Sequence, residues 1–108
     1  MPSYRNSTSG SIAANGASVT LAWKEFYNGG VGVQLTGTFS GTLQFEMTIN
    51  GTDFVAVQTT SVTTGTIATT ATATGVFFFN CVGALSVRVR STAWTSGTAT
   101  VALAAMPG

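Results

Sequence analysis

The stretch Gly41-Thr-Leu-Gln-Phe-Glu-Met-Thr-Ile-Asn50 alternates strictly between apolar and polar side chains. Successive side chains of an extended strand point to opposite faces, so this pattern predicts a strand with one buried and one solvated face. Four apolar residues are expected on the buried face: Leu43, Phe45, Met47 and Ile49. The Asn50-Gly51 dipeptide that follows tolerates positive φ and predicts a hairpin, in which residues 53–58 return beside this strand.

Further strand patterns lie on both sides of this hairpin. They occupy residues 18–23, 31–39, 76–80, 85–90 and 98–104, and Gly-containing turns such as Ser96-Gly97 separate them. About eight short strands without a helical period predict an all-β fold, an antiparallel β-sandwich or jelly roll. A closed barrel is the lesser alternative.

The segment Val76-Phe-Phe-Phe79 is apolar on both faces of its predicted strand. We expect the facing sheet to cover one side and an arm, a loop or a partner to cover the other. The expected core residues are Leu43, Phe45, Phe77, Phe79, Val87 and Val89.

Residues 1–17 are rich in Ser, Asn, Gly and Ala and show no period of two or 3.6. This composition predicts an N-terminal arm that is flexible unless another surface orders it, followed by a β-sandwich domain at 18–108. Residues 1–10 lack the charged start and apolar stretch of a secretory signal, which predicts folding in the cytoplasm where the chain is made. No segment approaches the run of about 20 apolar residues that a spanning helix needs, so no membrane partner is expected.

Charged residues make up only 6% of the 108 residues, and the formal net charge is +1. Nucleic-acid binding needs clustered Lys and Arg, so no nucleic-acid partner is expected. Such weak electrostatic repulsion favours association, which indicates a protein that assembles with itself or with others.

The chain has no His, which removes the commonest general base and metal ligand. Its carboxylates are Glu25, Glu46 and Asp53, and we expect Glu46 and Asp53 to be solvated on the outer face and loop of the predicted hairpin. The single cysteine, Cys81, has no His partner and is expected to be a buried, inert thiol. The sequence therefore predicts a protein that is not an enzyme, with no catalytic residues, no metal site and no cofactor.

Five residues are candidates for binding a partner: Tyr4, Arg5, Arg88, Arg90 and Trp94. Arg88 and Arg90 lie two apart on one predicted strand and so share a face. There they either bind a carboxylate of a neighbouring subunit or acidic partner, or are simply solvated. Trp94 precedes the Thr95-Ser96-Gly97 turn, where its ring either stacks on a sugar or caps the core.

Several of these segments resemble small virion structural domains of tailed bacteriophages. The resemblance covers residues 11–21, 33–46 and 50–54, and residues 85–90 followed by 94–101 look like the closing hairpin of those domains. It spans nearly the whole chain from about Ser9 and consists of strands and turns, without a catalytic signature.

This resemblance implies a capsid decoration or cement protein on the virion surface. Such a protein binds the major capsid protein and stabilises its shell, and it is often a trimer, so a homo-oligomer is expected. No motif specific to capsid binding is present. A tail or fibre module, or a host-adhesion module that binds carbohydrate, therefore stays open as the alternative.

Overall fold

The computed structural model describes residues 6–22, 30–81 and 83–105. Nine strands form in these ranges: β1 (Asn6–Ile12), β2 (Ser18–Ala22), β3 (Gly30–Thr48), β4 (Val55–Ala56), β5 (Thr59–Ser61), β6 (Ile67–Ala68), β7 (Thr70–Ala71), β8 (Gly75–Asn80) and β9 (Ser86–Ala105). Every pairing between them is antiparallel. This part of the chain contains no helix that is long and apolar enough to cross a membrane.

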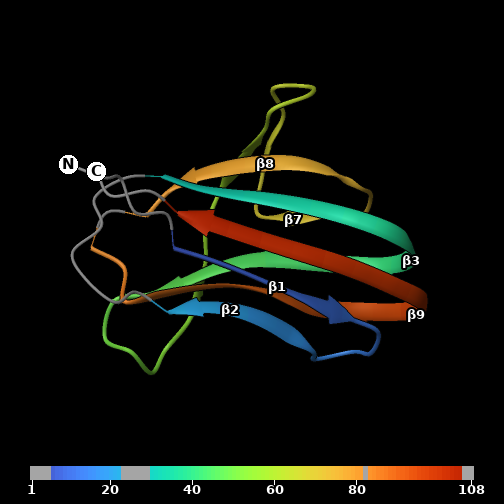
Figure 1. Cartoon of the computed structure of the whole chain (residues 1–108), viewed down its shortest axis with the longest axis horizontal. Coiled ribbons are helices and arrows are strands. Elements are labelled where there is room, and N and C mark those ends of the chain that lie inside the picture. The colour runs from blue at the N-terminus through green and yellow to red at the C-terminus, as the bar shows by residue number, and fades with distance from the viewer. Residues whose placement is uncertain (1–5, 23–29, 82, 106–108) are drawn as a thin grey trace.

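The long strands β3 and β9 organise the fold, because they pair along their lengths and both bend near the middle. Their register runs from Val31 opposite Ala105 to Thr48 opposite Ser86. Figure 1 shows both strands turning back at the right-hand edge of the molecule. The sheet thereby folds over on itself, and the prediction of an all-β antiparallel sandwich is confirmed.

Each half of β3 and β9 belongs to a different layer of this sandwich. In the first layer the strand order is β1-β9-β3-β8-β5-β6. In the second layer β2 pairs with the other half of β9, and β4 and β7 pair with the other half of β3. Residues 13–17 join β1 to β2 and so also cross from one layer to the other.

Two bulges and two glycines make the bend possible. Thr92 and Thr95 of β9 are skipped in its register with β3, and an extra residue of this kind bends a strand and increases its twist. Gly37 and Gly97 have φ angles of +97° and +87°, a region that residues with a Cβ rarely adopt. The sequence pattern predicts separate strands and a turn at Ser96-Gly97, whereas the chain continues through this point as one strand.

One hydrophobic core lies between the layers. Its buried members alternate along the strands, and they are Ile12, Val19, Leu21, Val31, Val33, Leu35, Leu43, Phe45, Ala71, Phe79, Cys81, Ala84, Val87, Val89, Ala99, Val101, Leu103 and Ala105. Phe77 is partly buried against this cluster. All six predicted core residues therefore face the core.

Ile49 corrects one part of the predicted alternation. Its side chain is 65% exposed, because β3 ends at Thr48 and the chain then turns into the loop before β4. Alternation places a side chain on a buried face only while the strand continues, so the expectation that Ile49 joins the core is wrong.

The predicted hairpin after Asn50 is present, with a shorter return strand than expected. β4 pairs with β3 at only two positions, Glu46 with Ala56 and Met47 with Val55. The Asn50 side-chain oxygen accepts hydrogen bonds from the backbone N–H groups of Thr52 and Asp53, both at 2.8 Å. These bonds close the loop locally, as Asn side chains commonly do in turns.

Part of the segment expected as an arm instead forms the edge strand β1. Seven residues of β1 pair with β9, from Asn6 opposite Ala105 to Ile12 opposite Ala99, and Ile12 is fully buried. Main-chain pairing with β9 holds β1 in the sheet, although Ile12 is its one large apolar residue. Residues 1–5 of the predicted arm lie outside the described residues.

Candidate partner-binding surface

The structure brings two of the five candidate residues together. Arg88 and Arg90 lie on β9 in the second layer and project from its outer face, as their spacing predicts. Trp94 lies further along β9, where the strand bends. Tyr4 and Arg5 lie outside the described residues.

Both arginines hold a single carboxylate of the same chain, that of Glu46. Arg88 Nε donates to Glu46 Oε1, and Arg90 donates to Oε2 through Nη2 at 2.9 Å and Nε at 3.1 Å. Gln44 Nε2 also donates to Oε2. The register explains this arrangement, because Glu46 lies directly opposite Arg88 and Gln44 directly opposite Arg90.

The prediction that Glu46 is solvated on the outer face is wrong, since its side chain is only 2% exposed. Five hydrogen bonds, donated by four nitrogen atoms, compensate for the removal of this carboxylate from water. The Arg88 guanidinium also lies 3.9 Å from the centroid of the Phe54 ring, a favourable cation–π distance.

The cluster of Arg88, Glu46 and Arg90 has one positive charge in excess. The two arginine side chains remain 25% and 33% exposed beside the buried carboxylate. Each guanidinium has more N–H groups than Glu46 accepts. The outer face of the second layer can therefore receive a further acidic group from outside the molecule.

The hydrogen bonds to Glu46 also lower the pKa of its carboxyl group. Burial alone would raise the pKa of Glu46, but the hydrogen bonds from Arg90, Arg88 and Gln44 outweigh it, and the pKa lies below its ordinary value. A carboxyl group whose pKa is lowered by folding stabilises the fold above its unfolded pKa. That contribution is lost as the pH falls through the lowered pKa.

We therefore expect the difference in unfolding free energy between the wild type and Glu46→Gln to disappear at acidic pH. Glu46→Gln will lower the free energy of unfolding by about 1–3 kcal/mol at neutral pH, the usual range for hydrogen bonds to charged groups. The gap between the two proteins will narrow as the pH falls below the ordinary carboxyl range. Urea unfolding of both proteins across this range measures the gap, and a gap that stays constant down to strongly acidic pH would contradict the assignment.

Trp94 makes contacts that favour the core-capping role over the sugar-binding role. Its ring stacks on Phe39 with centroids 5.4 Å apart and planes 5° from parallel. Its indole N–H donates to the backbone oxygen of Gly97 at 3.2 Å. Gly41 lies against the ring so closely that a Cβ there would be 2.5 Å from Cε3. These contacts hold Trp94 at the bend of the sheet.

Cys81 is buried, as predicted, and burial raises the pKa of its thiol. Within residues 6–22, 30–81 and 83–105, no three His, Cys, Asp or Glu side chains gather closely enough to hold a metal ion.

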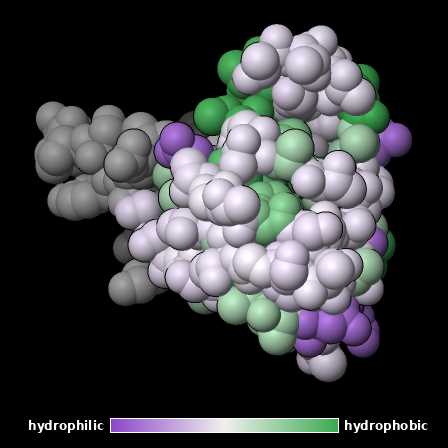
Figure 2. Space-filling model, turned by 90° about the vertical axis from the view of Figure 1, so that its right-hand side faces the viewer, coloured by the Kyte–Doolittle hydropathy of each residue, from purple (hydrophilic) through white to green (hydrophobic). Residues whose placement is uncertain are grey.

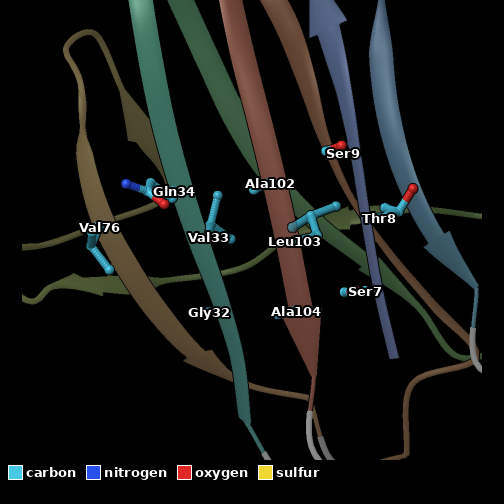
Figure 3. Close-up of a pocket in the computed structure, with 10 residues that line it drawn as sticks. All are labelled: Ser7, Thr8, Ser9, Gly32, Val33, Gln34, Val76, Ala102, Leu103 and Ala104. Carbon is cyan, nitrogen blue, oxygen red and sulfur yellow. The ribbon is translucent and has the colours of Figure 1, made fainter. Parts of the chain in front are cut away.

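An open trough of about 590 Å³ lies on the outer face of the first layer. It crosses β1, β9, β3 and β8, and Figure 3 shows the residues that line it: Ser7, Thr8, Ser9, Gly32, Val33, Gln34, Val76, Ala102, Leu103 and Ala104. The sequence does not predict this feature, because most of its members are small and they come from strands far apart in the chain.

The fold is similar to that of two proteins with solved structures. The SPBc2 prophage-derived protein YomS matches with a TM-score of 0.76 and 16% identity, over 98% of this chain and 97% of that one. The PBSX exported protein XepA matches with a TM-score of 0.76 and 16% identity, over 94% of this chain and 38% of that one. At this identity the likeness is one of fold. No family model matches the chain, and no curated protein matches it.

Proposed function

We propose that the chain is a structural protein of a bacteriophage particle, a capsid decoration or cement protein that binds the major capsid protein and stabilises its shell. In this proposal it acts on the virion surface after synthesis in the host cytoplasm, without catalysis and without a nucleic-acid or membrane partner.

One observation supports the phage assignment above all others. A prophage-derived protein shares this fold over almost the full length of both chains, with a TM-score of 0.76. The sequence pattern independently resembles virion structural domains. Fold alone does not fix function. The surface chemistry supports the choice of the capsid as the partner, and a binding experiment tests it.

The second-layer face supplies the contact in this proposal. Its excess positive charge at Arg88 and Arg90 favours an acidic surface, and complementary charge steers such an encounter. Tyr4 and Arg5, the other two candidates from the sequence, lie outside the described residues and are tested by the deletion below. Trp94 takes a structural role at the bend.

Purified protein mixed with phage heads assembled without it tests the proposal by co-sedimentation. We expect saturable binding at a fixed ratio to the capsid subunit. Thr20→Glu places a carboxylate on β2, directly opposite Arg88 of β9. We expect it to weaken head binding by about tenfold, because the added negative charge repels an acidic partner surface. Asn15→Glu, in the loop between β1 and β2, is the matched control and should bind normally.

A variant lacking residues 2–5 tests the contribution of Tyr4 and Arg5 without removing β1 or the buried Ile12. Its binding should weaken while its thermal unfolding stays unchanged. Failure of the intact protein to bind heads would overturn the capsid proposal. Binding to tails or to host-surface glycans instead would move the assignment to the alternative module.

A further inference from the structure

The outer face of the first layer combines a bulky apolar strip with a strip of small residues. Cross-strand pairing defines one row across six strands: Ile67, Thr60, Phe78, Gly32, Ala104 and Ser7. A second row beside it consists of Val62, Val76, Gln34, Ala102 and Ser9. The side chains of both rows point away from the core, because their strand neighbours are the inward residues.

One end of these rows is an apolar ridge on β6, β8 and the turn that follows β5, which we call the Phe78 ridge and define by Val62, Ile67, Val76 and Phe78. All four are exposed, Phe78 to 52%. In Figure 1 the yellow-green segment that joins β5 to β6 projects at the top of the molecule. Figure 2 shows strongly hydrophobic residues gathered around this projection, whereas most of the remaining view is of intermediate hydropathy.

The other end of the rows is the trough of Figure 3, whose floor is formed by Gly32, Ala102 and Ala104. The ridge adjoins the trough on the same face, since Phe78 on β8 lies directly opposite Gly32 on β3. Val76 belongs to both features and joins them. Such a surface has a raised half and a hollow half side by side. A two-fold rotation between two copies places the raised half of each against the hollow half of the other.

We propose that two copies of this chain pack face to face through the outer faces of their first layers. The two-fold axis runs along β3, so that the Phe78 ridge of each copy fills the trough of the other. Such an interface is isologous, with the same patch used on both copies. Two sheets packed in this way keep their strands approximately aligned.

The charges of the molecule favour a second copy as the occupant. The charged residues that the structure describes are Glu46, Asp53, Arg88 and Arg90, and none lies on this face. Near a two-fold axis each group lies close to the same group of the second copy. A charged side chain there would therefore be repelled by an identical charge. An uncharged face avoids this repulsion, whereas it offers nothing to a charged partner.

Gln34 fits the same geometry. It is the long polar side chain at the centre of the second row, on the strand over which the axis passes. A primary amide both donates and accepts hydrogen bonds, so it can pair with an identical amide across a two-fold axis.

Sedimentation velocity of the purified protein over a range of concentrations tests the pairing without any phage component. We expect a concentration-dependent dimer. Ala102→Arg places a charge in the trough and should weaken self-association by at least about tenfold, as disruption of an interface centre does. Asn15→Arg adds the same charge in the exposed loop between β1 and β2 and should dimerise normally, and circular dichroism checks that both variants fold.

Cross-linking tests the position of the axis. Under mild oxidation Gln34→Cys should form a covalent dimer much faster than Thr20→Cys, which is on the second layer. A wild type that stays monomeric, a trimer or larger ring, or equal cross-linking at both positions would each overturn the proposal. Because these experiments use the protein alone, their failure is distinct from a failure to bind phage heads.

Discussion

Replacing Phe45 with alanine will lower the free energy of unfolding by about 3–5 kcal/mol, the usual cost of emptying a buried aromatic site. Phe45 is fully buried in the second-layer half of β3. Its ring lies 5.2 Å from that of Phe77 and 6.5 Å from that of Phe79, centroid to centroid. These rings come from β8 in the first layer, whereas Phe45 belongs to the second, so the contact joins the two layers.

The loss is large beside the total stability of a small domain, about 5–15 kcal/mol. Urea unfolding followed by circular dichroism measures it directly. Ile49→Ala is the matched control, because Ile49 has the same predicted alternation but is exposed, and its replacement should change stability by less than about 0.5 kcal/mol. If the two substitutions cost the same, the assignment of Phe45 to the core and Ile49 to solvent is wrong.

This pair also shows how far alternation alone can predict the fold. Local periodicity identified Leu43, Phe45, Val87 and Val89 as core residues because side-chain direction depends only on neighbouring residues of one strand. It failed at Ile49 because the end of a strand depends on the turn that follows. It missed β1 because an edge strand of Ser, Thr and Gly is stabilised by main-chain bonds that leave no apolar pattern.

The cluster of Arg88, Glu46 and Arg90 could not be predicted from the sequence, for a different reason. The spacing of the two arginines predicts that they share a face, where they either bind a carboxylate of another molecule or are simply solvated. The carboxylate comes from the same chain, 42 residues from Arg88. Only the register between β3 and β9 reveals this proximity, and register between strands so distant in sequence depends on the whole fold.

The bend in β3 and β9 could not be predicted from the sequence either, because Ser96-Gly97 has the composition of a hairpin turn. A glycine with positive φ is compatible with a tight turn and with a bulged, bent strand alike. The choice is made by pairing, since β3 bends at the matching position. In this register Phe39 lies opposite Gly97 and Ala99 lies opposite Gly37.

Gly97→Ala is the substitution that tests this bend, and we expect it to be among the most destabilising single changes in the chain. The φ of +87° at Gly97 costs a residue with a Cβ about 1–2 kcal/mol by itself. The added Cβ would also lie 2.7 Å from the Phe39 Cα and would collide with the backbone oxygen of Thr38. Backbone atoms of the paired strand cannot rotate aside as a side chain can, so β3 and β9 must separate at the bend.

Gly16→Ala isolates the steric part of this effect. Gly16 has nearly the same φ, +84°, but nothing lies within 4 Å of the Cβ that alanine would add. We expect Gly16→Ala to cost only the conformational share, about 1–2 kcal/mol, and Gly97→Ala to cost clearly more in the same urea titration. Equal costs would mean that β3 and β9 do not approach each other closely at the bend. A larger cost at Gly97 would support a sandwich held together by one sheet that folds over there.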